Sequence, residues 1–451
     1  MFYTMIIVFV IGYACIALEH PLQINKSATA LILGAVMWVL LSMGDPSTMP
    51  IFSDFQQYLQ TNPNGNFASW LSHAPLLEHL GEISEILFFL IGAMTIVELI
   101  DSYDGFSIIT NNINTTKKTS LLWIIALLSF FMSAILDNLT TSIVMVALLR
   151  KLILDKEDRW FYAGMVIVAA NAGGAWSPIG DVTTIMLWIA GKVSAQNIIV
   201  MTFLSSLVSL LVPLLILSLT MKGNVRRPEG IKGGKEVCLS KSESKFILFL
   251  GVGTLLFVPV FKSITHLPPY LGMLLGLGFM WLVTEILNRK RDEEDQIDLG
   301  VSNILKKIDM PSMLFFLGIL MAVAAMQTGG QLFALSQSLE TIPLEEPNKY
   351  YVITSIIGVL SSIVDNVPLV AGAMGMYDFP MDHYFWEFLA YAAGTGGSIL
   401  IIGSAAGVAV MGMEKIDFIW YLKKISLLAF IGYAAGCGTY IFQKMIHDML
   451  L

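Results

Sequence analysis

The sequence predicts an all-α polytopic membrane protein with two related halves, and three observations support this fold class. Its 451 residues are 56% hydrophobic and only 13% charged, too few polar side chains to cover a soluble globule. Apolar runs close to the roughly 20 residues that cross a bilayer recur along the chain. Several sequence blocks occur twice, once in each half. The net charge of −8 comes without a basic patch, which argues against a nucleic-acid partner and leaves the lipid bilayer as the expected surroundings.

The internal repeat consists of three short blocks that keep their order in both halves. The blocks are LFFL at 87–90 and 314–317, ILDN at 135–138 matched by IVDN at 363–366, and NAGG at 171–174 matched by GTGG at 394–397. Because all three recur in one order, they indicate a duplication. We expect a first repeat over residues 1–221, a cytoplasmic linker over 222–244 and a second repeat over 245–451.

The distribution of basic residues predicts the topology. No Lys or Arg lies between Lys26 and Lys117, although this interval includes the polar loop 44–80. By the positive-inside rule that loop is external, whereas the linker, with Arg226 and Arg227, is cytoplasmic. The N-terminus is then expected on the outside.

The segment 119–150 is predicted to form a re-entrant hairpin. Lys118 and Lys151 flank it, so both of its ends belong in the cytoplasm. One continuous helix of this length would measure about 46 Å, which is too long for one crossing and too short for two. A turn at Asp137 and Asn138, near the middle of the membrane, resolves this conflict.

The matching segment 350–376 has acidic flanks, Glu345 and Asp378, and is expected to enter from the outside. Matching blocks with opposite flanking charges indicate inverted-topology repeats, and such repeats place a binding site near the midplane between them. The complete expectation is about ten full spans plus two hairpins.

Each half also contains a span that we expect to be broken in its middle. The first, over 160–190, contains Gly173, Gly174 and Pro178, and the second, over 384–413, contains the glycines of the matching block. Glycine pairs and proline release backbone carbonyls from helical hydrogen bonds, and lipid tolerates such carbonyls only beside a cavity or ligand.

Three aspartates lie in otherwise apolar segments: Asp137, Asp181 and Asp365. A charged carboxylate at a helix centre costs about 2.5–3.5 kcal/mol on insertion scales, so each needs a physical reason. Two reasons stay open at this point. Each aspartate could cap the N-terminus of a half-helix, or the three could line an ion site. The density of polar groups around them favours the ion site, because a cap needs only one short polar residue.

The polar groups of these segments are hard oxygen donors. Carboxylate, amide, hydroxyl and unwound carbonyl oxygens suit an alkali cation. A buried carboxylate also favours its neutral form, so a proton would compete with the cation for it. The first half supplies Asp137, Asn138, Thr140, Thr141, Asn171, Ser177, Asp181, Thr183 and Thr184.

Other titratable residues are weaker candidates. Glu98 lies close to a helix end, where extension of its side chain to the membrane surface is an equal explanation. The six histidines lie near span ends or in loops, so we expect none of them to sense pH.

Three motifs carry a resemblance to a known family: DNLTT at 137–141, SPIGDVTT at 177–184 and SSIVDNVP at 361–368. With these motifs the chain resembles, over nearly its whole length, the NhaD-type sodium/proton antiporters of the ion transporter superfamily. The resemblance implies functional roles for Asp137, Asn138, Asn171, Asp181, Thr183, Thr184, Ser361, Asp365 and Asn366, and further for Ser398 and Ser404. Within this set, Na⁺ is expected at Asp137, Asn138, Asp181, Asp365 and Asn366.

The resemblance also implies a mode of action. It predicts two hairpins and two unwound helices around a central site, in a homodimer that exchanges Na⁺ or Li⁺ for H⁺ across a bacterial inner membrane. No cofactor and no enzymatic activity are expected. Because Ser404 stands in the second copy where an equivalent of Asp181 would be, the site is expected to be asymmetric.

Two other functions compete with this one. A sodium-coupled carboxylate or oxyanion transporter of the same architecture would carry neutral hairpin tips, whereas aspartates at both tips would repel a dicarboxylate unless sodium neutralised them. An intramembrane aspartyl protease is suggested by Ile179-Gly180-Asp181, which resembles a Gly-x-Gly-Asp motif. The first glycine of that motif is absent here, and the duplication serves no purpose in a protease.

Overall fold

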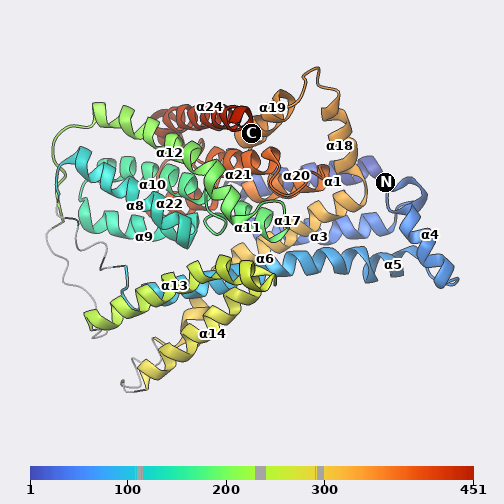
Figure 1. Cartoon of the computed structure of the whole chain (residues 1–451), viewed down its shortest axis with the longest axis horizontal. Coiled ribbons are helices and arrows are strands. Elements are labelled where there is room, and N and C mark those ends of the chain that lie inside the picture. The colour runs from blue at the N-terminus through green and yellow to red at the C-terminus, as the bar shows by residue number, and fades with distance from the viewer. Residues whose placement is uncertain are drawn as a thin grey trace. The chain divides into compact units, whose positions relative to one another are not determined.

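The structure, a computed structural model, describes residues 1–106, 108, 113, 115–228, 240–289, 291 and 299–450. All regular elements within these ranges are helical, and one isolated antiparallel bridge joins Lys117 to Asn224. Figure 1 follows the chain through them. The middle of the expected linker over 222–244 lies outside the described residues.

The helices of the first half begin near the N-terminus and reach residue 220. They are α1 Phe2–Ala17, α2 Glu19–Leu22, α3 Lys26–Ser42, η1 Pro46–Thr48, α4 Phe52–Thr61, α5 Phe67–His73, α6 Pro75–Ser102, α8 Lys118–Leu136, α9 Asn138–Leu152, α10 Lys156–Ala175, α11 Val182–Ile189 and α12 Ala195–Thr220.

The described residues of the second half are also helical. Its helices are α13 Lys241–Thr265, α14 Pro269–Asn288, α16 Val301–Ile304, η2 Leu305–Lys307, α17 Met310–Thr328, α18 Gln331–Glu340, α19 Asn348–Leu360, α20 Asn366–Met376, α21 Tyr384–Gly396, α22 Ala405–Glu414, α23 Phe418–Tyr421, the π-helical turn Leu422–Ser426 and α24 Leu427–Leu450.

Seven helical segments among the described residues are long and apolar enough to cross a membrane. They are Phe67–Ser102, Lys118–Leu136, Ala195–Thr220, Lys241–Thr265, Pro269–Asn288, Met310–Thr328 and Phe418–Met449. Shorter apolar helices include Lys26–Ser42 and Ala405–Glu414. The chain is therefore an all-α, multi-span membrane protein, while the expected ten spans, two hairpins and inverted repeats stay predictions.

The chain forms two compact units, each drawing on both halves of the sequence. Unit 1 comprises Met1–Phe88, Asp309–Ile353 and Val367–Pro380, and unit 2 comprises Phe89–Ile308, Thr354–Asn366 and Met381–Leu451. In unit 1, α3 packs on α17 at Gly34, where any side chain would overlap the backbone of Gly318. The indole of Trp38 fixes this contact by donating to the carbonyl of Met321 over 2.9 Å.

Helices α8 and α9 of unit 2 form an antiparallel pair. Both outer ends of the pair bond one short segment: Lys118 N donates to Gly223 O over 3.0 Å, and Leu154 N donates to Arg226 O over 2.8 Å. The chain reverses at Asp137, whose φ of 79° is rare for a residue other than glycine. By length, α8 alone is about 28 Å long, so Asp137 lies at the far end of a nearly span-length helix.

The two expected broken spans are interrupted at their glycines. Helix α10 ends at Ala175 and α11 begins at Val182, while α21 ends at Gly396 and α22 begins at Ala405. Within unit 2, α10 packs on α8, α9, α21 and α22, so both broken spans belong to one packed group (Figure 1).

Equivalent positions of the sequence repeat make equivalent contacts. Ser133 Oγ donates to Ala170 O over 2.6 Å, and in the second copy Ser361 Oγ donates to Ala393 O over 2.7 Å. A Cβ at Gly173 would overlap the carbonyl of Phe130, and one at the matching Gly396 would overlap the carbonyl of Gly358. In each copy, therefore, a serine and a glycine hold the hairpin segment directly against the broken span.

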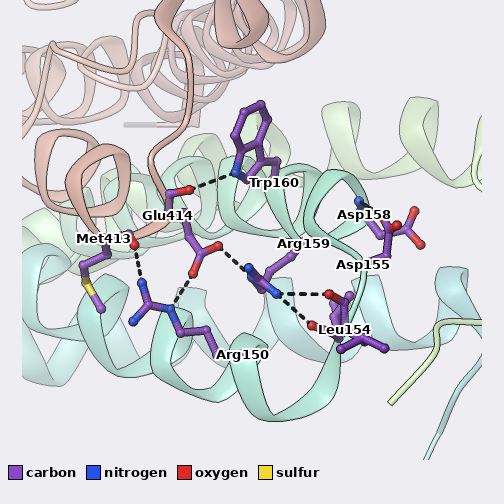
Figure 2. A network of polar contacts seen from close by, with 9 residues as sticks. Arg150, Leu154, Asp155, Asp158, Arg159, Trp160, Met413 and Glu414 are labelled. Atoms are coloured by element: carbon purple, nitrogen blue, oxygen red, sulfur yellow. Dashed lines mark hydrogen bonds and ion pairs between the residues drawn. The ribbon is translucent and has the colours of Figure 1, made fainter. Parts of the chain in front are cut away.

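An ion-pair network around the buried Glu414 joins α9, α10 and α22 (Figure 2). The carboxylate of Glu414, 1% exposed, accepts from Arg150 Nε and Arg159 Nε, each over 2.6 Å. Arg150 also bonds the carbonyl of Met413, and the indole of Trp160 donates to the carbonyl of Glu414 over 3.1 Å. Each guanidinium therefore fastens a different helix to the end of α22.

Replacing Glu414 with Gln should destabilise the protein by about 1–3 kcal/mol, because the partly exposed guanidiniums of Arg150 and Arg159 each lose a charged acceptor. The measurement is the thermal unfolding midpoint of the purified protein in detergent. Lys444→Ala is the control, since it breaks an i,i+4 pair with the half-exposed Asp448 and should cost about 0.5 kcal/mol or less. Equal midpoints for the two variants would contradict a structural role for the network.

Candidate functional site

The candidate site is centred on the carboxylate of Asp181, which is buried with 1% exposure. Its Oδ1 accepts from Asn138 Nδ2 over 3.0 Å, and its Oδ2 accepts from Asn366 Nδ2 over 3.1 Å. Thr183 Oγ1 also donates to Oδ2, over 2.6 Å. Asn138 and Asn366 occupy matching positions of the repeat, so the same residue of each half binds the same carboxylate.

Local folding brings these groups together at helix N-termini. Asn138 is the first residue of α9, Asn366 is the first residue of α20, and Asp181 immediately precedes α11. The first N–H groups of a helix lack internal partners, and its dipole is positive at that end. Thr184 fixes the turn into α11, because its hydroxyl donates to Asp181 O over 2.8 Å. The surroundings therefore stabilise a negative charge without a cationic side chain.

A second layer connects this carboxylate to the other broken span. Asn171 Oδ1 accepts from Asn138 Nδ2 over 3.0 Å, while Asn171 Nδ2 donates to Ser398 Oγ over 3.0 Å and to Ser404 Oγ over 2.9 Å. The Ser404 hydroxyl also accepts from Gly407 N and so caps α22. The residue that corresponds to Asp181 in the second copy thus serves as a neutral cap.

Asp137 is bound within its own helix. Its Oδ1 accepts from Thr140 N and its Oδ2 accepts from Thr140 Oγ1, each over 2.8 Å. These two hydrogen bonds are the helix-capping arrangement, one of the two roles that the sequence allows for Asp137. They involve Thr140 and not Asp181. Asp365, half-buried, directly precedes Asn366 in the chain. Asp137 and Asp181 are therefore not equivalent, because donors from other segments converge on Asp181.

Of the other hydroxyl residues in these segments, some bond the backbone of a neighbouring helix and others have no protein partner. Ser177 Oγ donates to Ala134 O over 2.5 Å and, like Ser361, braces the hairpin against a broken span. Thr141 Oγ1 and Ser142 Oγ are buried and have no protein partner. They follow Asn138 by three and four residues, which places all three on one face of α9. These hydroxyls are available to a ligand beside the amide that binds Asp181.

The donor set suits an alkali cation better than a transition metal. Across the described ranges, no group of three or more His, Cys, Asp or Glu side chains could hold a metal ion. The groups that bind Asp181 are two amide N–H donors and one hydroxyl, so the oxygens open to a cation here are those of the carboxylate and of nearby hydroxyls, which Na⁺ accepts in place of water. A single carboxylate supplies one negative charge, enough to neutralise one monovalent cation or one proton.

Glu98, Glu387 and Glu414 make their contacts outside this network. Glu98 pairs with Lys307 over 3.3 Å near the end of α6, so the structure gives it the role of an ion-pair partner. Sequence reasoning missed the buried Glu387 and Glu414. Glu387 lies in an otherwise apolar span. A carboxylate in an apolar segment is the feature that identified Asp181, and the same feature could have identified Glu387. Glu414 directly precedes Lys415 at the end of its span, so the sequence gives no sign that its carboxylate is buried.

Comparisons with known proteins agree with these features. Residues 13–396 match the family model described as citrate transporter, CitMHS. The chain is 46% identical over 450 residues to sodium/proton antiporter 1 of Arabidopsis thaliana, covering 98% of this chain and 73% of the relative. It is 32% identical over 450 residues to the Na⁺/H⁺ antiporter NhaD of Vibrio cholerae, covering 93% and 87%. The NhaD of Alkalimonas amylolytica is 30% identical over 466 residues, covering 97% and 90%.

These matches bear on two further expectations. The relatives come from both a plant and bacteria, so a bacterial inner membrane stays a prediction. The family and the relatives are transporters, which rules against the protease alternative for Asp181. Because the matches extend over most of the chain, the protein belongs to the citrate transporter family, among its NhaD-type antiporters, and is a membrane transporter rather than an enzyme.

Proposed function

We propose that this protein exchanges Na⁺ or Li⁺ for H⁺ across its membrane, with the cation and the proton binding in turn at Asp181. One observation carries the proposal: a single buried carboxylate is bound by an asparagine from each half of the chain and by no cationic side chain. The relatives named as sodium/proton antiporters support it. Li⁺ is included because its hard-oxygen preference matches that of Na⁺.

The hydrogen bonds of Asp181 accommodate both ligands. Ionised, the carboxylate accepts from Asn138, Asn366 and Thr183, and lone pairs remain for a cation. Protonated at Oδ2, it donates to Thr183 Oγ1, whose hydroxyl hydrogen turns away. Either ligand leaves the site with the same net charge, so in a low dielectric one replaces the other without exposing a bare charge.

A carboxylate transporter is the second candidate, and the family model described as citrate transporter favours it. Helix N-termini and asparagine amides are also a suitable site for an anion. In this chain, however, the carboxylate of Asp181 already occupies those donors. A second carboxylate would meet a fixed negative charge at close range. The arrangement therefore supports a cation as the cargo.

We further propose that the two halves, 1–221 and 245–451, are inverted repeats and that transport proceeds by alternating access. In this scheme the hairpins enter from opposite sides, and Asp181 is exposed to one side at a time. Assembly as a homodimer follows from the resemblance to the family. The equivalent serine and glycine contacts in the two copies support the duplication on which the scheme rests.

Asp181→Asn should reduce exchange to the level of empty liposomes, since an amide keeps the shape of the side chain but holds neither a proton nor a cation. The measurement is dissipation of a pH gradient in proteoliposomes on addition of NaCl or LiCl. Asp158→Asn is the control, because that residue pairs with Lys118 in the first turn of α10, far along the helix from Asn171. Proton movement with citrate or succinate but never with Na⁺ would instead favour the second candidate.

Asp137→Asn separates capping from ion binding, because asparagine caps a helix as well as aspartate does. We expect this variant to keep the unfolding midpoint of the wild type and to lose exchange, as a residue of the cation site would. The two quantities are measured on the same preparation. Full exchange in this variant would leave Asp137 with the cap alone.

The apparent KM for Na⁺ should fall as the pH rises, by up to about tenfold per unit, and reach a plateau once the site is deprotonated. The sign follows from competition: a proton on Asp181 excludes the cation, and raising the pH removes it. Initial exchange rates over a range of pH and Na⁺ give the KM. Replacing all six histidines together should leave this dependence in place. A KM that does not change with pH would contradict direct competition.

Single cysteines should reveal opposite hairpin orientations. In a background without the three native cysteines, Thr119→Cys and Asp155→Cys should react with an impermeant maleimide only from the cytoplasm. Pro347→Cys and Asp378→Cys should react only from outside. Reaction of all four from one side would refute the inverted repeat while leaving the chemistry at Asp181 untouched.

A further inference from the structure

A second buried carboxylate lies outside the Asp181 network. Glu387, in the first turn of α21, is 2% exposed. Its Oε1 accepts from the amide of Asn197 on α12, and its Oε2 lies 2.5 Å from the hydroxyl of Tyr440 on α24. These three helices pack together in unit 2 (Figure 1). The function proposed above does not use this group.

The partners of Glu387 suit both of its protonation states. The hydroxyl of Tyr440 lies within reach of two acceptors, Glu387 Oε2 and, at 3.1 Å, the backbone carbonyl of Tyr384. When Glu387 is ionised, the hydroxyl donates to it. When Glu387 is protonated, its O–H donates to Tyr440 Oη, and the hydroxyl turns to Tyr384 O. A proton can therefore be gained or lost by turning one hydroxyl, with no buried polar atom left unpaired.

The charges near Glu387 are few and largely engaged elsewhere. Lys444 on α24 and Asp382 before α21 act on it electrostatically. Lys444 bonds Asp448 over 3.0 Å, and Asp382 accepts from Ser194 N over 2.6 Å. The other titratable groups at this end are His383, which caps α21, His447 on α24, and Lys192, which lies over the ring of Trp386. Helix α11 carries none, and on α10 they are confined to its opposite end.

The helix that carries Glu387 also contacts the carboxylate of Asp181. A Cβ at Gly394 would lie 3.2 Å from Asp181 Oδ2. Gly394 follows Glu387 by seven residues, so the two share one face of α21 and lie about 10 Å apart along its axis. Glu387 thus lies about two helical turns from the proposed exchange site, toward the end that the charge distribution predicts to be external.

We propose that Glu387, with Tyr440 as its hydrogen-bond switch, is a second proton-binding site, which takes up and releases a proton during exchange without binding the cation. This inference rests on the proposed exchange of Na⁺ for H⁺. It gives the proton two binding positions, Glu387 on the external side and then Asp181 in the exchange site, whereas the cation binds only in the exchange site.

Glu387→Gln tests this, because glutamine keeps the shape and an acceptor but cannot titrate. Equilibrium binding of ²²Na⁺ to the purified variant should stay within about twofold of the wild type, since Asp181 is intact, whereas the exchange rate should fall at least about tenfold. Infrared difference spectra between acidic and alkaline pH should lose one C=O band of a protonated carboxylic acid. Glu285→Gln is the control, because Glu285 is exposed and its side chain accepts from Trp281 of its own helix.

A second pair of variants distinguishes the loss of a titrating group from misfolding. Tyr440→Phe removes the switch but keeps the ring that stacks on Phe388 at 4.8 Å, and it should shift the pH at which the infrared band titrates. Glu387→Asp should restore a titrating band. A Glu387→Gln protein with wild-type exchange and an unchanged infrared spectrum would overturn the inference while Na⁺/H⁺ exchange stands. A wild-type protein that moves no protons with Na⁺ would remove the proposed function and this inference together.

Discussion

A charged carboxylate inside a bilayer must be bound by donors that lipid cannot provide, and this requirement at Asp181 organises much of unit 2. Its three donors, Asn138, Asn366 and Thr183, come from chain segments that begin helices. Helix N-termini at this position exist only because the chain turns at Asp137 and unwinds before Val182. The turn and the unwound segment in turn require close backbone approach, which Gly173 permits. Hairpin, broken span and small residues are thus consequences of binding one charge.

The duplication supplies matching amides but not matching carboxylates. Asn138 and Asn366 reach the same group from the two halves, whereas Ser404 stands where a second Asp181 would lie. A further carboxylate at the position of Ser404, beside Asn171, would add another buried negative charge in a low dielectric. A serine instead accepts from Asn171 and caps α22, which keeps the polar contacts and removes the excess charge. The asymmetry expected from the sequence therefore has a simple electrostatic reason.

The sequence was informative where local chemistry decides the structure. Glycine and proline located the breaks near Ala175 and Gly396, and flanking charge indicated the reversal at Asp137. It could not distinguish Asp137 from Asp181, because an aspartate before a helix is equally suited to cap it or to bind a ligand. Only the tertiary contacts separate them: Asp137 bonds Thr140 of its own helix, whereas Asp181 collects donors more than 40 residues away in either direction.

Two buried carboxylates in unit 2 illustrate how the choice of donor decides what a charge can do. Glu414 is held by two guanidiniums, which balance its charge and make it a structural tie between helices. Asp181 is held by amides and a hydroxyl, which orient it but do not neutralise it. An arginine in place of Asn138 would satisfy the same oxygens and at the same time exclude both proton and cation. Neutral donors leave one unit of negative charge available, and a site that exchanges one positive ion for another needs that charge to remain uncompensated by the protein.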